Sequence, residues 1–152
     1  MMHGARRFFA LVASGALLAG GVQAVRADAA PLDDVVAAIR DAGGHYRYGS
    51  ATLHAADCSG LVSVAQSLAM GQPPRRLGTT ATLVAGRWPH AIPGADPRHR
   101  FVIGGDHHHM SAAINGVAIE ATCCGQPFRI GADARSPFTF PHVFHIDEKV
   151  LA

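Results

Sequence analysis

The spacing of apolar residues changes along this chain, and the change narrows the folds that it can adopt. Up to residue 70, apolar residues recur at helical spacing, which predicts helices over residues 31–42 and from Asp57 or Cys58 to a stop at Gly71. Beyond residue 100, short runs separated by turn signals predict strands, over 101–103, 109–114, 117–122, 127–130 and 142–146. Helices followed by an antiparallel meander predict an α+β domain, with N-terminal helices packed on a small antiparallel sheet.

Between these two regions the pattern is weaker. Residues 78–88 have an ambiguous period to which a short helix fits, and residues 89–100 are rich in proline and glycine, which predicts a loop. Within the strand region, Asn115-Gly116 lies between two alternating segments and predicts a two-residue hairpin turn. Such a turn would pair Ile114 with Val117 and thereby set the register of both strands.

The N-terminal residues 1–29 have the features of a targeting peptide. Arg6 and Arg7 precede an apolar run from Phe8 to Leu18, and small residues suited to cleavage follow by position 29. The paired arginines fit the Sec route and also the twin-arginine route. The apolar run is too short to span a bilayer comfortably, so we expect residues 30–152 to form one exported domain with no stable membrane insertion after cleavage.

The charge balance of this domain argues against nucleic-acid binding. The whole chain has 13 basic and 11 acidic residues. Arg6, Arg7, Arg26 and Asp28 fall within the expected targeting peptide, which leaves the domain formally neutral. It has no basic stripe with interleaved aromatic residues, which is the pattern expected of a nucleic-acid binder. The adjacent Arg75-Arg76 fits a solvated turn better than a contact with an acidic peptide.

The three cysteines cannot all pair within one chain. Cys123 and Cys124 are adjacent, and a bridge between neighbours closes a strained small ring, so a stabilising disulfide framework is not expected. Cys58 is therefore the candidate for a functional free thiol.

Cys58 lies at the predicted start of a helix, within Asp57-Cys58-Ser59-Gly60. Free N–H groups and the positive end of the helix dipole favour a thiolate at such a position and lower the pKa of the thiol. The same N–H groups can stabilise an oxyanion during attack on a carbonyl. The alternative is a buried cysteine that acts only as a small apolar side chain.

His109 is the candidate base for this thiol, with Glu120 as its partner. On a strand over 109–114, residue parity directs His109 away from the packed face, whereas His108 would share that face with Met110. The predicted hairpin register sets Glu120 diagonal to His109 on the same face, unless a bulge changes the pairing. The alternative for Glu120 is a carboxylate that faces solvent.

Four segments together resemble the NlpC-type cell-wall cysteine peptidases of the papain-like superfamily. They are residues 46–50 (Tyr-Arg-Tyr-Gly-Ser), 57–62 (Asp-Cys-Ser-Gly-Leu-Val), His109, and 119–121 (Ile-Glu-Ala). The Asp-Cys-Ser-Gly-Leu-Val segment at a helix start is the specific one, and the others support it. The resemblance covers about residues 44 to 122.

The resemblance implies a papain-like fold and a role for each matching residue. Cys58 would be the nucleophile, His109 the general base and acid, and Glu120 the third polar residue. Tyr46 would help to polarise the scissile carbonyl, and the backbone N–H groups of Cys58 and Ser59 would lie beside it.

The sequence departs from the family pattern in several places. Ser50 replaces a glycine, Met110-Ser111 follows the histidine in place of Val-Gly, and the hairpin turn is one residue shorter. The third position is more often His, Asn or Gln in the family than Glu. A shortened Gly104-Gly105-Asp106 stretch directly precedes the histidines.

We therefore expect a secreted or envelope-located monomeric endopeptidase that hydrolyses amide bonds of peptidoglycan stem peptides, with no cofactor. One alternative is a weak or inactive NlpC-like module that binds the cell envelope. The other is a metal-binding protein, whose candidate ligands are residues 107–109, Cys123, Cys124, His142 and His145. Consecutive strand residues alternate between faces and the spacing matches no compact zinc signature, so no metal is expected.

Overall fold

A computed structural model describes residues 31–151, which form an α+β arrangement of helices on an antiparallel sheet. The prediction of a targeting peptide over residues 1–29 lies outside the described residues. This described part of the chain contains three α-helices: α1 (Leu32–Ala42), α2 (Cys58–Ala69) and the short α3 (Thr80–Val84). None of the helices within residues 31–151 has the length and apolar content that a bilayer-crossing segment needs.

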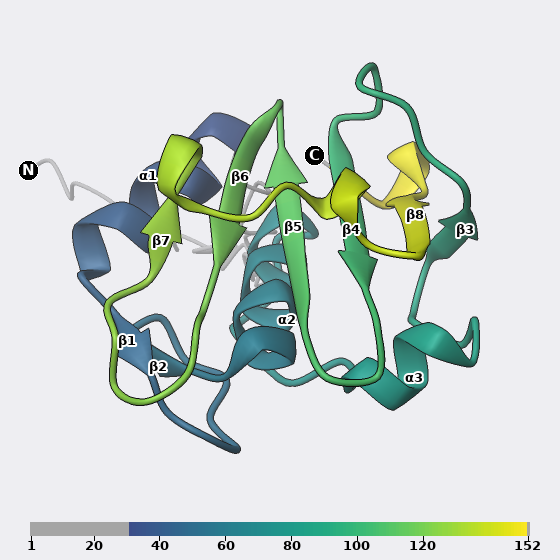
Figure 1. The fold of residues 1–152 in the computed structure, drawn as a ribbon. Coiled ribbons are helices and arrows are strands. Elements are labelled where there is room, and N and C mark those ends of the chain that lie inside the picture. The colour runs from purple at the N-terminus through teal and green to yellow at the C-terminus, as the bar shows by residue number, and fades with distance from the viewer. Residues whose placement is uncertain (1–30, 152) are drawn as a thin grey trace, which may run out of the picture.

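The six-stranded sheet has the order β3-β8-β4-β5-β6-β7 and is antiparallel throughout. Its strands are β3 (Ala91–Pro93), β4 (Phe101–Gly105), β5 (Met110–Ile114), β6 (Val117–Glu120), β7 (Arg129–Ile130) and β8 (His142–Ile146). A separate parallel pair, β1 (His45–Tyr46) and β2 (Ala55–Ala56), precedes α2. Figure 1 shows α1 and α2 together behind one face of the sheet, while the segment between β7 and β8 crosses the other face. The predicted packing of N-terminal helices on an antiparallel sheet is confirmed.

Local sequence signals account for both long helices. Helix α1 follows Pro31, has two aspartates in its first turn, and ends at Gly43 with φ 58°, a left-handed conformation that glycine adopts without strain. Helix α2 is capped by Asp57, whose side chain accepts a hydrogen bond from the Gly60 N–H. Ten of the residues of α2 are buried, so this helix runs through the centre of the domain.

The predicted hairpin and its register are confirmed. Asn115 and Gly116 both have positive φ, 46° and 80°, as a type I′ turn requires. Ile114 pairs with Val117, and the pairing continues to Ala112 opposite Ile119. Because this turn is short, it sets which side chains of β5 and β6 share a face.

Both strands of this hairpin are shorter than predicted at the end away from the turn. Strand β5 begins at Met110, because Asp106 accepts hydrogen bonds from the N–H groups of His108 and His109 and holds a turn there. Strand β6 ends at Glu120, after which residues 123–125 turn through positive φ at Cys124. His108 is therefore not on the packed face of a strand, as the sequence parity suggested, but in this turn and exposed.

The core lies between the helices and one face of the sheet, and includes Leu61, Ile39, Met110 and Ile114. The opposite face was expected to point away from the core. It is covered instead by the 3₁₀ turn η2 (Pro137–Thr139), so that Ser111 and Ala113 are buried as well. Gly104 permits this close cover, since a Cβ at that position would collide with the Pro137 backbone.

The weakly patterned segments over residues 78–100 contain two short elements. Helix α3 lies within the predicted 78–88 region, and β3 lies inside the loop predicted over 89–100. In the strand region, the strand predicted over 127–130 reduces to the two residues of β7. Strands of two or three residues are too short to show a period in the sequence.

Candidate active site

The N-terminus of α2 is held by a hydrogen-bonded cluster centred on the Asp57 carboxylate. Oδ1 accepts from the Gly60 N–H at 2.7 Å and from Ser59 Oγ at 3.1 Å, and Oδ2 accepts from the Gly49 N–H at 2.9 Å. The side chain of Asp57 is only 11% exposed. The carboxylate therefore ties the loop before the helix to the first turn of the helix, on both sides of Cys58.

Arg76 completes this cluster. Its Nη2 forms an ion pair with Asp57 Oδ2 at 2.9 Å and donates to the Ser50 carbonyl at 2.8 Å, while its Nη1 donates to Ser59 Oγ at 2.8 Å. A partly buried carboxylate needs such a cation. Sequence analysis missed this role, since Arg75-Arg76 was expected to be a solvated turn. The sequence does predict that Asp57 caps the helix, but a capping aspartate does not by itself indicate which cation pairs with it.

Gly60 allows the loop to pack against the helix. A Cβ at this position would collide with the Ser50 carbonyl oxygen, the same oxygen that Arg76 binds. A residue with a side chain would push the loop away from α2, so the glycine in the Asp-Cys-Ser-Gly segment has a steric reason.

The environment of Cys58 raises the pKa of its thiol. Burial is the largest cause and the nearby Asp57 carboxylate is the second, whereas backbone N–H groups of Ser59, Met110 and Cys58 itself lower the pKa by a smaller amount. The prediction that the helix start lowers the pKa of Cys58 is therefore wrong for the net shift, although the backbone N–H groups do lower it as expected. The thiol is only partly exposed, so desolvation of the thiolate outweighs these N–H groups. The resting group is a thiol that needs a base.

His109 and Glu120 form the predicted pair. His109 Nε2 lies 2.7 Å from Glu120 Oε1, and the other carboxylate oxygen accepts the Arg135 backbone N–H at 2.9 Å. Glu120 is 5% exposed and His109 is 25% exposed. Glu120 is thus a buried acceptor with both oxygens engaged, rather than the solvent-facing carboxylate of the alternative reading.

The turn before β5 fixes where the His109 ring can lie. Asp106 Oδ1 accepts the His108 N–H at 2.8 Å and the His109 N–H at 2.9 Å, and these contacts hold the pKa of Asp106 below its ordinary value. The Phe140 ring packs near the imidazole, with a centroid distance of 6.0 Å. With Nε2 committed to Glu120, Nδ1 is the ring nitrogen available to a second group.

Cys58 and His109 belong to the same end of the domain. The Met110 N–H is one of the groups that stabilise the Cys58 thiolate, and Met110 directly follows His109 in the chain. Helix α2 packs on β5. In Figure 1, β5 starts at the end of the domain where the chain leaves β2 and enters α2.

Tyr46 lies with Cys58 and Ser59 on a cavity of about 460 Å³. Burial, followed by Cys58 and Asp57, raises the pKa of the Tyr46 hydroxyl, so this group stays protonated and can donate a hydrogen bond. The cavity is also lined by Tyr48, Gly49, Asp57, Arg76, Thr79, Thr80, His107 and His108. The predicted site residues Cys58, Ser59 and Tyr46 therefore share one cavity, and His108 lies at its edge while His109 pairs with Glu120.

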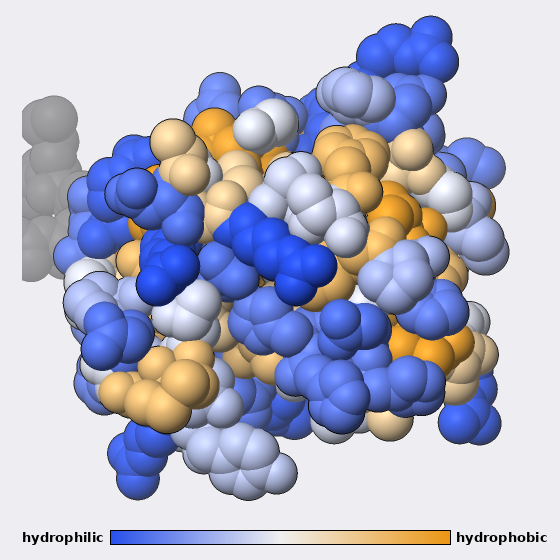
Figure 2. Space-filling model, in the orientation of Figure 1, coloured by the Kyte–Doolittle hydropathy of each residue, from blue (hydrophilic) through white to orange (hydrophobic). Residues whose placement is uncertain are grey.

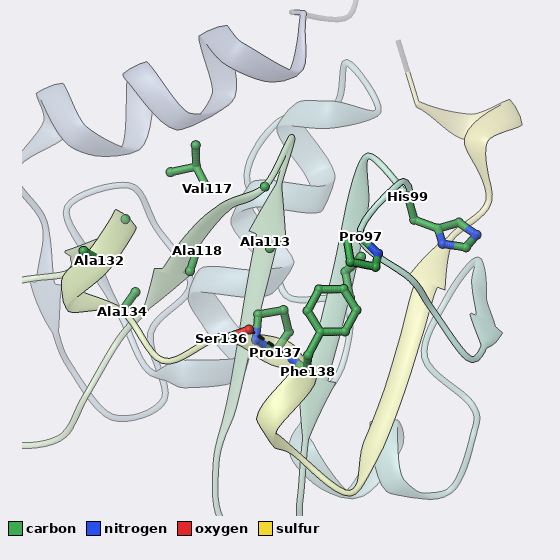
Figure 3. A pocket seen from close by; sticks show the side chains of 13 residues that line it. Pro97, His99, Ala113, Val117, Ala118, Ala132, Ala134, Ser136, Pro137 and Phe138 are labelled. Atoms are coloured by element: carbon green, nitrogen blue, oxygen red, sulfur yellow. Dashed lines mark hydrogen bonds between the residues drawn. The ribbon is translucent and has the colours of Figure 1, made fainter.

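A second cavity lies on the opposite face of the sheet. It has a volume of about 550 Å³, with Val102, Ala113 and Ala118 on the strands and Pro137 and Phe138 in the covering segment. Figure 3 shows these side chains around a largely apolar hollow, and Figure 2 shows hydrophobic residues gathered on this face over β4. None of the predicted site residues lines this cavity.

The metal-binding alternative requires a cluster of ligand side chains. Within residues 31–151, no three His, Cys, Asp or Glu side chains lie together as a metal site would need. His145 stacks on His99, with a centroid distance of 3.9 Å, rather than joining His142. Cys58, Cys123 and Cys124 are all free thiols.

Comparison of this chain with protein-family models, with curated proteins and with solved structures finds no match in any of the three.

Proposed function

We propose that this protein is an exported cysteine peptidase of the NlpC type, with a papain-like fold, that hydrolyses amide bonds in peptidoglycan stem peptides. One observation supports this above all others: a buried carboxylate, Glu120, holds the ring of His109 beside the strand residue whose N–H reaches Cys58. The thiol belongs to a helix start, the imidazole to the turn before β5, and the carboxylate to the end of β6. These are the three groups that this kind of nucleophilic catalysis uses.

The raised pKa of Cys58 is consistent with such a mechanism. A neutral thiol is a weak nucleophile, so His109 Nδ1 must take its proton before or during attack on the amide carbon. The sulfur–carbon bond then forms, and the carbonyl oxygen becomes an oxyanion. His109 returns the proton to the leaving amine as the amide bond breaks. Water hydrolyses the resulting thioester and regenerates the thiol.

Other groups near Cys58 suit the oxyanion. The backbone N–H groups of Cys58 and Ser59 lower the pKa of the thiol, which means that they face developing negative charge at this position. The protonated Tyr46 hydroxyl is a further donor in the same cavity. Together these donors would stabilise the tetrahedral intermediate. Glu120 would stabilise the positive charge that His109 acquires.

The experiment that tests this function compares the purified protein with its Cys58→Ala variant on isolated peptidoglycan. We expect the wild type to release new free amines and matching shortened stem peptides, read by mass spectrometry, and the variant to release none. Arg75→Gln is a control for surface charge, because Arg75 is exposed and its side chain donates to Gln72. Equal product from the wild type and Cys58→Ala would refute the proposal.

Further measurements on the same protein separate peptidase activity from the two alternatives. Burial of the Cys58 thiol leaves it protonated, which fits a slow enzyme or a module that only binds the envelope. Sedimentation of the protein with peptidoglycan, without release of amines from any substrate preparation, would favour the binding module. Loss of activity with a chelator and its return with zinc would instead favour a metal-dependent protein.

A further inference from the structure

The two cysteines that the proposed mechanism does not use lie in one exposed turn. Cys123 and Cys124 follow the end of β6, and both side chains are exposed. Cys124 has φ 71° and Gly125 has φ 77°, so the backbone turns sharply through the left-handed region directly after the pair. This conformation presents both thiols to solvent on a short, exposed loop.

The two exposed thiols influence each other. The Cys123 side chain is the largest cause of the raised pKa of Cys124. Adjacent residues seldom direct their side chains to the same side in a strand, because successive side chains alternate between faces. The positive φ of Cys124 interrupts the extended backbone, so this alternation does not hold the two side chains apart here.

This turn is also joined to the candidate active site. The residue after it, Gln126, accepts the Tyr46 N–H at 2.8 Å, and Pro127 forms a β-bridge with His45. Cys123 and Cys124 are close enough to Tyr46 to contribute to the raised pKa of its hydroxyl. A change in this turn would therefore reach the strand that carries Tyr46.

We propose that Cys123 and Cys124 form a vicinal dithiol that exchanges with disulfide-bearing molecules and closes reversibly to an intramolecular disulfide. A bridge between neighbours closes a strained small ring, and strained, exposed disulfides are the labile ones that serve catalysis or regulation rather than stability. Such a bond would be a reversible modification site in the turn that precedes Gln126, which binds the Tyr46 N–H.

The exchange balances without any group beyond the donor disulfide. The Cys123 thiolate attacks one sulfur of the donor, the donor S–S bond breaks, and one donor thiolate leaves. Cys124 then loses its proton and attacks Cys123 in the mixed disulfide, which releases the second donor thiolate. The protein loses two electrons and two protons, and the donor gains them as two thiols.

Access explains why the pair would react before Cys58. Attack on a disulfide requires a sulfur that the donor can approach, and Cys58 is only partly exposed whereas Cys123 and Cys124 are both exposed. Burial also disfavours the thiolate of Cys58. The pair would thus take up oxidising equivalents at the edge of the site while the nucleophile stays reduced.

The test uses glutathione disulfide as the donor and the Cys58→Ser variant of the purified protein, in which only the pair remains. We expect both thiols to become resistant to alkylation, and mass spectrometry to find no glutathione attached to the protein. Dithiothreitol should fully restore alkylation of both thiols. Adding Cys124→Ser should instead trap one stable glutathione adduct, because ring closure is no longer available. Retained glutathione in Cys58→Ser, or disulfide-linked dimers of it, would overturn the proposal.

A second measurement uses the wild type. After the same treatment, we expect peptide mapping to find Cys58 still open to iodoacetamide and the peptide with residues 123 and 124 closed. A bond between Cys58 and either member of the pair would overturn the proposal. Neither measurement depends on peptidase activity, so this inference and the proposed function can fail separately.

Discussion

Replacing Glu120 by glutamine tests whether the buried carboxylate acts on Cys58 through His109. The two oxygens of Glu120 accept from two different donors, His109 Nε2 and the Arg135 N–H. A glutamine side chain has the same shape but only one acceptor oxygen, and its NH₂ group is a donor. In Glu120→Gln, the side chain can therefore accept from only one of these two partners and must present its NH₂ group to the other.

Each way of placing the amide has a cost. If the oxygen stays with His109, the amide NH₂ meets the Arg135 N–H in a site where Glu120 is 5% exposed, and the unsatisfied donors cost about 1–3 kcal/mol of folding free energy. If the oxygen turns to Arg135, the NH₂ donates to His109 Nε2. The ring proton must then reside on Nδ1, and that nitrogen can no longer accept the Cys58 proton.

In both cases the charged His109 loses its anionic partner. A hydrogen bond to a charged group contributes about 1.5–3 kcal/mol, which corresponds to a rate about 10- to 100-fold lower for any step that charges the imidazole. The assay is the rate of Cys58 alkylation by iodoacetamide near neutral pH, followed by mass spectrometry of the peptide that contains Cys58. Asp133→Asn is the matched control, because it removes an exposed carboxylate two residues before Arg135.

The outcome distinguishes two readings of the pair. An alkylation rate for Glu120→Gln equal to that of the wild type, together with a lowered unfolding free energy, would show that Glu120 only holds the Arg135 segment in place. The reasoning that links this carboxylate to the thiol would then be wrong.

Three further predictions concern the groups around this site. Arg76→Gln leaves the partly buried helix-cap carboxylate without its cation and should raise the pKa of Cys58 by roughly one unit in an alkylation-against-pH profile, while the exposed control Arg75→Gln should leave it unchanged; equal profiles would contradict this. Asp106→Ala should lower the free energy of unfolding by about 1 kcal/mol, whereas Asp106→Asn, which retains an acceptor oxygen, should lose less. Because the pKa of Asp106 is held below 3.8, its contribution to the free energy of unfolding is present above that pH and disappears as the pH falls through the lower pKa of the folded state. Urea titrations at still lower pH should therefore find the wild type and Asp106→Ala equally stable, and an undiminished difference in their unfolding free energies would contradict this. Gly60→Ala should destabilise by about 1–3 kcal/mol despite the gain of about 1 kcal/mol in helix propensity, and a stabilised variant in thermal unfolding would refute the steric reading.

Local signals were sufficient for the main elements of the fold and for the pairing at the site. The helix that begins at Cys58 follows from its cap and its apolar period, and the Asn115-Gly116 turn determines the register of β5 and β6 by its length. Because side chains alternate along strands, that register was enough to predict that His109 and Glu120 share a face. Their contact at 2.7 Å then needs only the right rotamers.

The parts that sequence analysis missed depend on segments far apart in the chain. Arg76 pairs with Asp57 from 19 residues further along the chain, and the amide of Arg135 reaches Glu120 from the segment before β8. The burial of Cys58 depends on everything packed around it, so the direction of its pKa shift required the assembled structure. No local period or spacing contains this information.

Glu120 contacts the main chain of residue 135 and not its side chain. This determines which substitutions at position 135 would keep the contact. The side chain of Arg135 lies over the Phe140 ring, 3.7 Å from its centroid, and contributes nothing to the bond that satisfies the carboxylate. Any residue with an amide hydrogen could therefore supply that bond. Proline alone is barred by chemistry, so related chains are free to vary at this position while they retain a tethered acid behind the imidazole.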